Sequence, residues 1–123
     1  MQSSDTASRS QVNLIASIFN SLQTMLNKTE TDLAGKVFTF NVTDVTPNQW
    51  YVNLKSTPAK CAQGSLKDAT PDVEFMMDSD TLVLIFNGKL KPSTAFVTGK
   101  MKFTGNFESA LQMEKLVEML TNP

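Results

Sequence analysis

Few residues of this 123-residue sequence are of the types that carry out enzymatic chemistry. It contains no histidine and a single cysteine, Cys61. Because histidine is a common proton-transfer group and metal ligand, its absence excludes Ser-His and Cys-His nucleophilic pairs and leaves almost no ligands for zinc. Asp78 and Asp80 precede an apolar run, where capping of a helix explains them better than acid–base catalysis. We therefore expect a protein that is not an enzyme and that has no cofactor and no metal.

The charged residues indicate which partners to expect. Eleven Lys and Arg against twelve Asp and Glu give a net charge of -1, which argues against nucleic acid as a partner. Four of the eleven basic residues are Lys89, Lys91, Lys100 and Lys102, and no acid lies between residues 88 and 103. This lysine cluster is either a solvated surface or a docking patch. As a docking patch it would place Lys89 and Lys91 against anionic membrane lipid or the phosphates of an acyl-coenzyme A.

The length predicts a single domain, over residues 11–121, that follows a polar N-terminal segment. Residues 1–10 contain four serines and show no apolar period, so we expect them to be disordered. No stretch is apolar for long enough to span a bilayer, and the N-terminal residues lack the pattern of a secretory signal. These features predict a cytoplasmic protein.

The elements that must position any functional side chain follow from apolar periodicity. Apolar residues at helical spacing predict a first helix over about 11–26, with Ser10 as its N-cap. Two short helices between the fourth and fifth strands, the second beginning at Pro92, would form a crossover that makes those two strands parallel. A last helix over 107–120 has an apolar arc wider than one contact with a sheet requires. Alternating polar and apolar residues predict strands at 38–43, 50–55, 72–77 and 100–104, and a less regular segment over 60–65, ended by Gly64, makes five.

The fold class that these elements indicate is α+β: a five-stranded, mostly antiparallel sheet with one face covered by about five helices. Large apolar side chains point from the sheet toward the helices. One interpretation is a well-packed core. The other is that the layers stand apart and enclose an apolar cavity for a lipid, which the seven methionines favour because flexible thioether chains adapt to different apolar ligands.

Several segments carry a recognisable pattern of residue types and spacing. They read WYVNLK at 50–55, DSDTL at 78–82, GKLKPSTAF at 88–96 and GKMKFTGN at 99–106. With them the chain resembles the sterol carrier protein-2 family over about residues 11–120, most strongly between 78 and 106. The resemblance implies an apolar tunnel between sheet and helices. It also implies non-covalent binding of fatty acids, fatty acyl-coenzyme A, sterols or related lipids.

The resemblance also identifies candidate tunnel residues on the two short helices, the fifth strand and the last helix. These candidates are Leu82, Ile85, Phe86, Leu90, Phe96, Met101, Phe103, Phe107 and Leu111. To them we add, from the inward face of the sheet, Phe40, Trp50, Phe75 and Met77 as further lipid-binding residues.

Two other functions stay open at this point. A fully packed core would leave an interaction module that makes transient contact with a membrane, or with a partner protein, through the lysine cluster. The domain would otherwise present a substrate within a larger catalytic chain, because the family also occurs in peroxisomal multifunctional enzymes and in stomatin-like membrane proteins. Many relatives end in a Ser-Lys-Leu type tripeptide, whereas this sequence ends in Thr121-Asn122-Pro123, so peroxisomal import is not expected.

Overall fold

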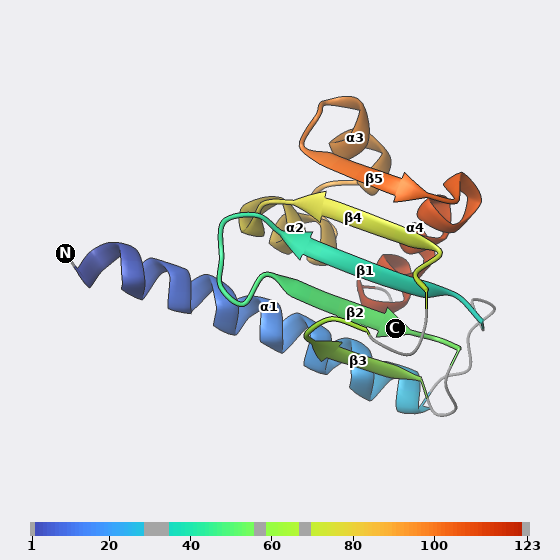
Figure 1. Ribbon diagram of the computed structural model, residues 1–123, viewed down its shortest axis with the longest axis horizontal. Helices are drawn as coiled ribbons and strands as arrows, with labels where there is room; N and C mark the ends of the chain where they lie inside the picture. Colours follow the sequence, from blue (N-terminus) through green and yellow to red (C-terminus); the bar gives the residue numbers. More distant parts are fainter. Residues whose placement is uncertain (1, 29–34, 56–58, 67–69, 122–123) are drawn as a thin grey trace.

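The structure is a computed structural model that describes residues 2–28, 35–55, 59–66 and 70–121. Within this part of the chain, one five-stranded sheet lies against four helices (Figure 1). The strands are β1 (Val37–Val42), β2 (Gln49–Asn53), β3 (Lys60–Gln63), β4 (Val73–Met77) and β5 (Met101–Gly105). The helices are α1 (Gln2–Lys28), α2 (Ser79–Phe86), α3 (Pro92–Val97) and α4 (Phe107–Thr121).

The strands lie in the order β3-β2-β1-β4-β5. β1 and β4 are parallel and the other three pairs are antiparallel, which confirms a mostly antiparallel sheet. The prediction that β4 and β5 run parallel is wrong. After β4 the chain passes through α2 and α3 and re-enters the sheet beside the end of β4, so that Met77 pairs with Met101 and β5 runs antiparallel to β4. In the described residues four helices are present rather than the expected five or so.

One face of the sheet is covered and the other is open. Along β4 the side chains of Val73, Phe75 and Met77 are buried, whereas those of Glu74 and Met76 are exposed. Figure 1 shows α1, α2 and α4 behind the sheet, and the buried side chains of the strands belong to one core with those of these helices. The predicted inward face is therefore confirmed.

Helix α1 starts earlier than its sequence predicts. It begins at Gln2, so residues 2–10, which we expected to be disordered, have a helical backbone, and Ser10 is not an N-cap. The segment contains no Gly or Pro, and extending an existing helix by one residue costs far less than starting one. The packed part of the helix, where Ile15, Phe19 and Leu22 are buried, is the existing helix from which residues 2–10 continue. The domain boundary expected at residue 11 stays a prediction.

A single glutamine joins α1 to the edge of the sheet. The Nε2 of Gln23 donates to the carbonyl oxygen of Ala59 at 2.8 Å, and its Oε1 accepts from the backbone N–H of Cys61 at 2.7 Å. This amide therefore satisfies one backbone donor of β3 and one acceptor of the residue that precedes it, as a neighbouring strand would. Covering an edge in this way removes a template for pairing with another chain.

Aromatic rings fill the space between the sheet and the helices. Phe19 of α1 stacks on Trp50 with ring centroids 5.2 Å apart, and Phe40 stacks on Phe75 at 5.3 Å. Phe86 of α2 contacts both Phe19 and Phe40. These rings are all at most 4% exposed. They form the centre of the core.

Helix α2 is fixed at its N-terminus by carboxylates. The side chain of Asp78 accepts from the backbone N–H of Thr81 at 2.9 Å, which confirms the predicted cap. Asp44 accepts from both the backbone N–H and the Oγ of Ser79. Gln11 of α1 donates to Ser79 and to Asp80 at 2.8 Å. The hydroxyl of Ser79 therefore links α1 and α2 to the loop that carries Asp44.

Candidate functional site

An apolar groove opens at the β5 edge of the sheet, between α3 and α4. Its volume is about 260 Å³. The side chains that line it come from both helices and from β5. The lining residues are Pro92, Ser93, Phe96, Val97, Met101, Phe103, Phe107, Ala110, Leu111 and Glu114.

The groove is continuous with the aromatic core. Phe103 of β5 lies 6.4 Å from Phe75 on one side, and 5.1 Å from Phe96 and 6.0 Å from Phe107 on the other, between ring centroids. Phe75 is fully buried, whereas Phe96 is 45% and Phe107 is 58% exposed. A row of rings thus leads from the interior to the surface, and an apolar molecule in the groove would contact them in turn.

The groove has few polar groups. Among the described residues that line it, Glu114 of α4 is the only charged one and Ser93 the only other polar one. Such a surface attracts apolar molecules through removal of water and offers little directional recognition. The arrangement fits a binding site with loose specificity rather than a catalytic site.

Five of the thirteen predicted lipid-binding residues line this groove: Phe96, Met101, Phe103, Phe107 and Leu111. Seven others are buried and pack against one another between sheet and helices, and Leu90 is partly buried against the same core. For those eight the role in lipid binding stays a prediction. The seven are Phe40, Trp50, Phe75, Met77, Leu82, Ile85 and Phe86.

Sequence reasoning missed Pro92, Ser93, Val97, Ala110 and Glu114 as lining residues. A signal was present for Ala110, because it belongs to the unusually wide apolar arc of the last helix. That arc is explained by the structure: Met113 and Leu116 face the core, whereas Phe107 and Leu111 face the groove. Val97 gave no signal, since its side chain is 81% exposed at the end of a short helix.

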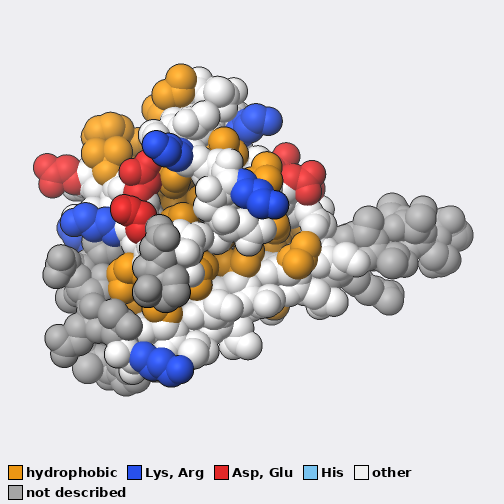
Figure 2. All heavy atoms as spheres, turned by 180° about the vertical axis from the view of Figure 1, so that it is seen from behind, with side chains coloured by type: hydrophobic (Ala, Val, Ile, Leu, Met, Phe, Trp, Pro, Cys, Tyr) orange, Lys and Arg blue, Asp and Glu red, His pale blue; other side chains and the backbone are white. Residues whose placement is uncertain are grey.

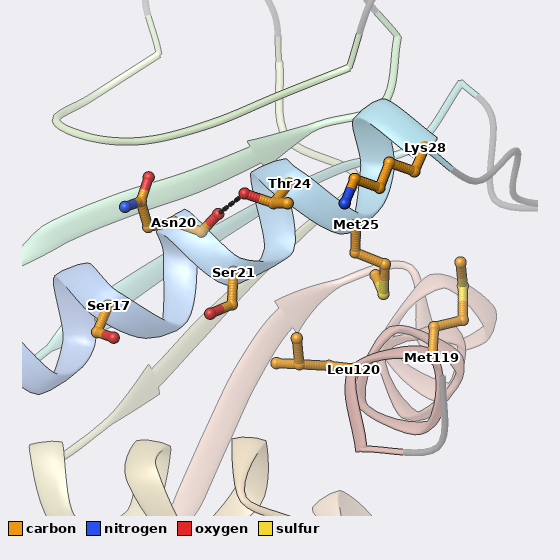
Figure 3. Close-up of a pocket in the computed structure, with 8 residues that line it drawn as sticks. All are labelled: Ser17, Asn20, Ser21, Thr24, Met25, Lys28, Met119 and Leu120. Carbon is orange, nitrogen blue, oxygen red and sulfur yellow. Dashed lines mark hydrogen bonds between the residues drawn. The ribbon is translucent and has the colours of Figure 1, made fainter.

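A second hollow, of about 420 Å³, lies between α1 and the end of α4 (Figure 3). Met25, Met119 and Leu120 approach one another at one end of it, while Ser17, Ser21 and other polar residues of α1 line the rest. A neighbouring hollow shares Ser17, Ser21 and Leu120 with it and reaches Phe86 of α2. Because an acyl chain there would remove hydroxyl groups from water, these hollows fit a lipid tail less well than the groove does.

The two lysines of the predicted docking patch lie in the α2–α3 connection. Lys89 and Lys91 are both exposed, and Lys91 directly precedes Pro92 of the groove. The lysines do not line the groove themselves. Their position is beside the apolar site rather than within it.

The single cysteine is chemically quiet. Cys61 is buried, and loss of water around it raises the pKa of its thiol to about 12. The reactive thiolate is therefore scarce at neutral pH.

None of the helices in the described residues is both long and apolar enough to cross a membrane.

The fold has counterparts among known proteins. A model of the SCP-2 sterol transfer family matches residues 19–118, which include the whole sheet and the groove. The chain belongs to this family. In the SCP-2 fold it is similar to sterol carrier protein 2 from Yarrowia lipolytica in its apo form, with a TM-score of 0.70 at 22% identity, over 86% of this chain and 91% of that one.

A second structure and a curated relative show the range of the SCP-2 family. Sterol carrier protein-2 from Aedes aegypti, in complex with palmitate, has a TM-score of 0.65 at 20% identity over 83% of this chain and 92% of that chain. Hydroxysteroid dehydrogenase-like protein 2 of Mus musculus is 36% identical over 86 residues, which are 70% of this chain and 17% of that protein. The chain spans a quarter or less of the length of the curated relatives that it matches.

Proposed function

We propose that this SCP-2 family domain binds the apolar part of a fatty acid, fatty acyl-coenzyme A or sterol in the groove between α3, β5 and α4. It carries this lipid between sites without covalent chemistry. The observation that supports the proposal is the partly exposed apolar lining, where Phe107 and Leu111 are each at least half exposed. A contiguous apolar surface of this kind commonly marks a binding site. The Aedes protein named above supports the same ligand class, since its structure is a complex with palmitate.

The energetics favour a long acyl chain. Each buried methylene contributes about 0.8 kcal/mol, so about fourteen of them contribute about 11 kcal/mol. Loss of ligand freedom and ordering of side chains take back several kcal/mol or more. The remainder corresponds to an affinity near the micromolar range, which suits a carrier that must release its lipid.

The groove would widen on binding. Its volume of about 260 Å³ is below the roughly 300–1,000 Å³ of typical ligand pockets. Helix α3 is the element suited to move, because it has six residues and buries only Pro92 and Ala95. Gly88 and Gly99 flank it with φ angles of 78° and 80°, which other residues rarely adopt.

The test is to titrate the wild-type chain and the variants Phe107→Asp and Leu111→Asp with a fluorescent fatty acid. Both side chains are already exposed, so the variants should fold, while a carboxylate in the groove must lose water when a lipid enters. We expect affinity to fall by about tenfold or more. Leu84→Asp is the matched control, because Leu84 is 40% exposed on α2 and lies outside the groove lining.

Circular dichroism and thermal unfolding establish that each variant is folded. Folded groove variants with wild-type affinity would refute the proposal, and so would a wild-type chain that binds no fatty acid. Phe86→Asp is unsuitable for this purpose, because Phe86 is only 2% exposed and its replacement would test folding instead.

Two finer expectations remain predictions. One is that the domain presents lipid to a catalytic part of a longer chain, which an activity comparison of the longer chain with and without the domain would test. The other is the cytoplasmic location, which microscopy of the tagged full-length protein would test.

A further inference from the structure

We infer that the α3 side of the groove docks on membranes that contain anionic lipid. This docking surface consists of Lys89, Lys91, Phe96 and Val97. The inference rests on the proposed lipid binding and adds the place where the lipid enters and leaves. It commits to the membrane surface as partner, whereas lipid binding itself requires no membrane.

The apolar part of the docking surface is unusually exposed. Among the described residues, four of the seven exposed large hydrophobic side chains line the groove: Phe96, Val97, Phe107 and Leu111. Val97 is the most exposed of the seven at 81%. In the view from the helical side, hydrophobic side chains lie at the end of the molecule where Figure 1 places α3 (Figure 2). The free energy falls when side chains of this kind leave water and enter the interfacial layer of a bilayer.

The charged part complements an anionic surface. Lys89 and Lys91 are exposed, and the segment from 88 to 103 contains no acid. Figure 2 shows Lys and Arg side chains beside the hydrophobic ones at this end of the molecule. Lys100 follows α3 instead, and its charge is the least of the causes that lower the pKa of Asp78, after the hydrogen bonds with Thr81. We assign the docking charge to the two lysines before α3.

Helix α4, on the other side of the groove, is acidic. It carries Glu108, Glu114 and Glu118 but one lysine, Lys115, and Glu114 lies in the groove lining. An anionic membrane attracts the α3 wall and repels the α4 wall, so the molecule docks with α3 toward the lipid. Because Phe96 and Val97 belong both to the docking surface and to the groove lining, a lipid tail could pass between bilayer and groove along apolar side chains.

The test is co-sedimentation of the whole chain with vesicles of phosphatidylcholine alone and with about 30 mol% phosphatidylserine. We expect partition onto the phosphatidylserine vesicles to exceed that onto neutral vesicles, and to fall as salt rises from about 0.1 M to about 1 M. A lysine near an anionic surface contributes about fivefold to partition, so Lys89→Gln/Lys91→Gln should lower it by about 25-fold. Val97→Asp should lower it as well.

The matched control for charge is Lys55→Gln/Lys60→Gln, which removes the same two charges from exposed positions at the other end of the sheet. Leu84→Asp serves the same purpose for Val97→Asp. Equal partition onto neutral and anionic vesicles, or equal losses in the test and control variants, overturns the inference. Fluorescent fatty acid titrated without vesicles reports lipid binding separately, so failure of docking and failure of the proposed function give different results.

Discussion

At the scale of single residues, Gly105 has the most demanding position. It ends β5 opposite Val73, with φ at 114°, and a Cβ there would overlap the carbonyl oxygen of Asp72. That carbonyl already accepts the backbone N–H of Asn106 at 2.9 Å, so it has little freedom to retreat. We expect Gly105→Ala to lower the free energy of unfolding by about 2–3 kcal/mol, measured by urea denaturation.

Gly64→Ala separates the two causes of this loss. Gly64 has nearly the same φ, 118°, but nothing lies within 4 Å of an added Cβ. Gly64→Ala should therefore add only backbone strain, without the overlap that Gly105→Ala also causes, and should lower the free energy of unfolding by less. Equal losses at the two positions would mean that β5 moves freely away from Asp72.

Local signals at this scale were readable from the sequence. The cap at Asp78 and the start of α3 at Pro92 depend only on neighbouring residues, and both predictions are confirmed. The partners of Gln23 were not predictable, because Ala59 and Cys61 lie 36 and 38 residues away along the chain. Nothing in the local sequence distinguishes this glutamine from an exposed one.

At the scale of elements, the amide of Gln23 holds α1 to β3. Gln23→Ala leaves the backbone N–H of Cys61 and the carbonyl of Ala59 without their partner, and we expect a loss of about 1–3 kcal/mol in the free energy of unfolding. Hydrogen exchange of the Cys61 amide should accelerate more than that of the inner strands. NMR exchange rates together with urea denaturation measure both effects.

Gln63→Ala is the control for this prediction, since Gln63 is an exposed glutamine on the same strand. It should change neither the exchange of Cys61 nor the stability by more than a few tenths of a kcal/mol. If the two variants behave alike, the contact from α1 does not stabilise the edge.

The types of the elements were predictable, but their pairing was less so. Alternation placed β1, β2, β4 and β5 close to their observed positions, because a half-buried strand must alternate, and the less regular segment over 60–65 contains β3. The direction of β5 depends on where α3 returns to the sheet, and no periodicity encodes that. The extra length of α1 likewise reflects continuation of a packed helix, which an unpatterned polar segment does not reveal.

At the scale of the whole molecule, lipid binding should depend on chain length. Fatty acids of eight to sixteen carbons should bind with affinities that rise by up to about 15-fold for every two methylenes, since each buried methylene contributes about 0.8 kcal/mol. The length at which affinity stops rising measures how far the opened groove extends. Titration calorimetry gives these affinities, and affinity independent of length would contradict an apolar binding site.

The sequence predicted that the fold is layered and that it has an apolar site, but not where in the fold that site lies. The inward face of the sheet, the wide arc of α4 and the resemblance to the family all indicated an apolar site between layers. The structure packs Phe40, Trp50 and Phe86 closely instead and opens the groove beside β5. Whether a given apolar side chain fills a core or lines a groove depends on how neighbouring helices diverge, which is a property of the assembled layers.

The burial of Cys61 has a practical consequence for experiments on this molecule. The only thiol in the chain is buried and remains protonated near neutral pH, so reagents that attack thiolates should pass it by while the protein is folded. A cysteine introduced at an exposed position such as Val97 could then be labelled selectively with a spin or fluorescent probe. Cys61 therefore need not be replaced before such a probe is used to measure depth in a membrane or distances within the protein.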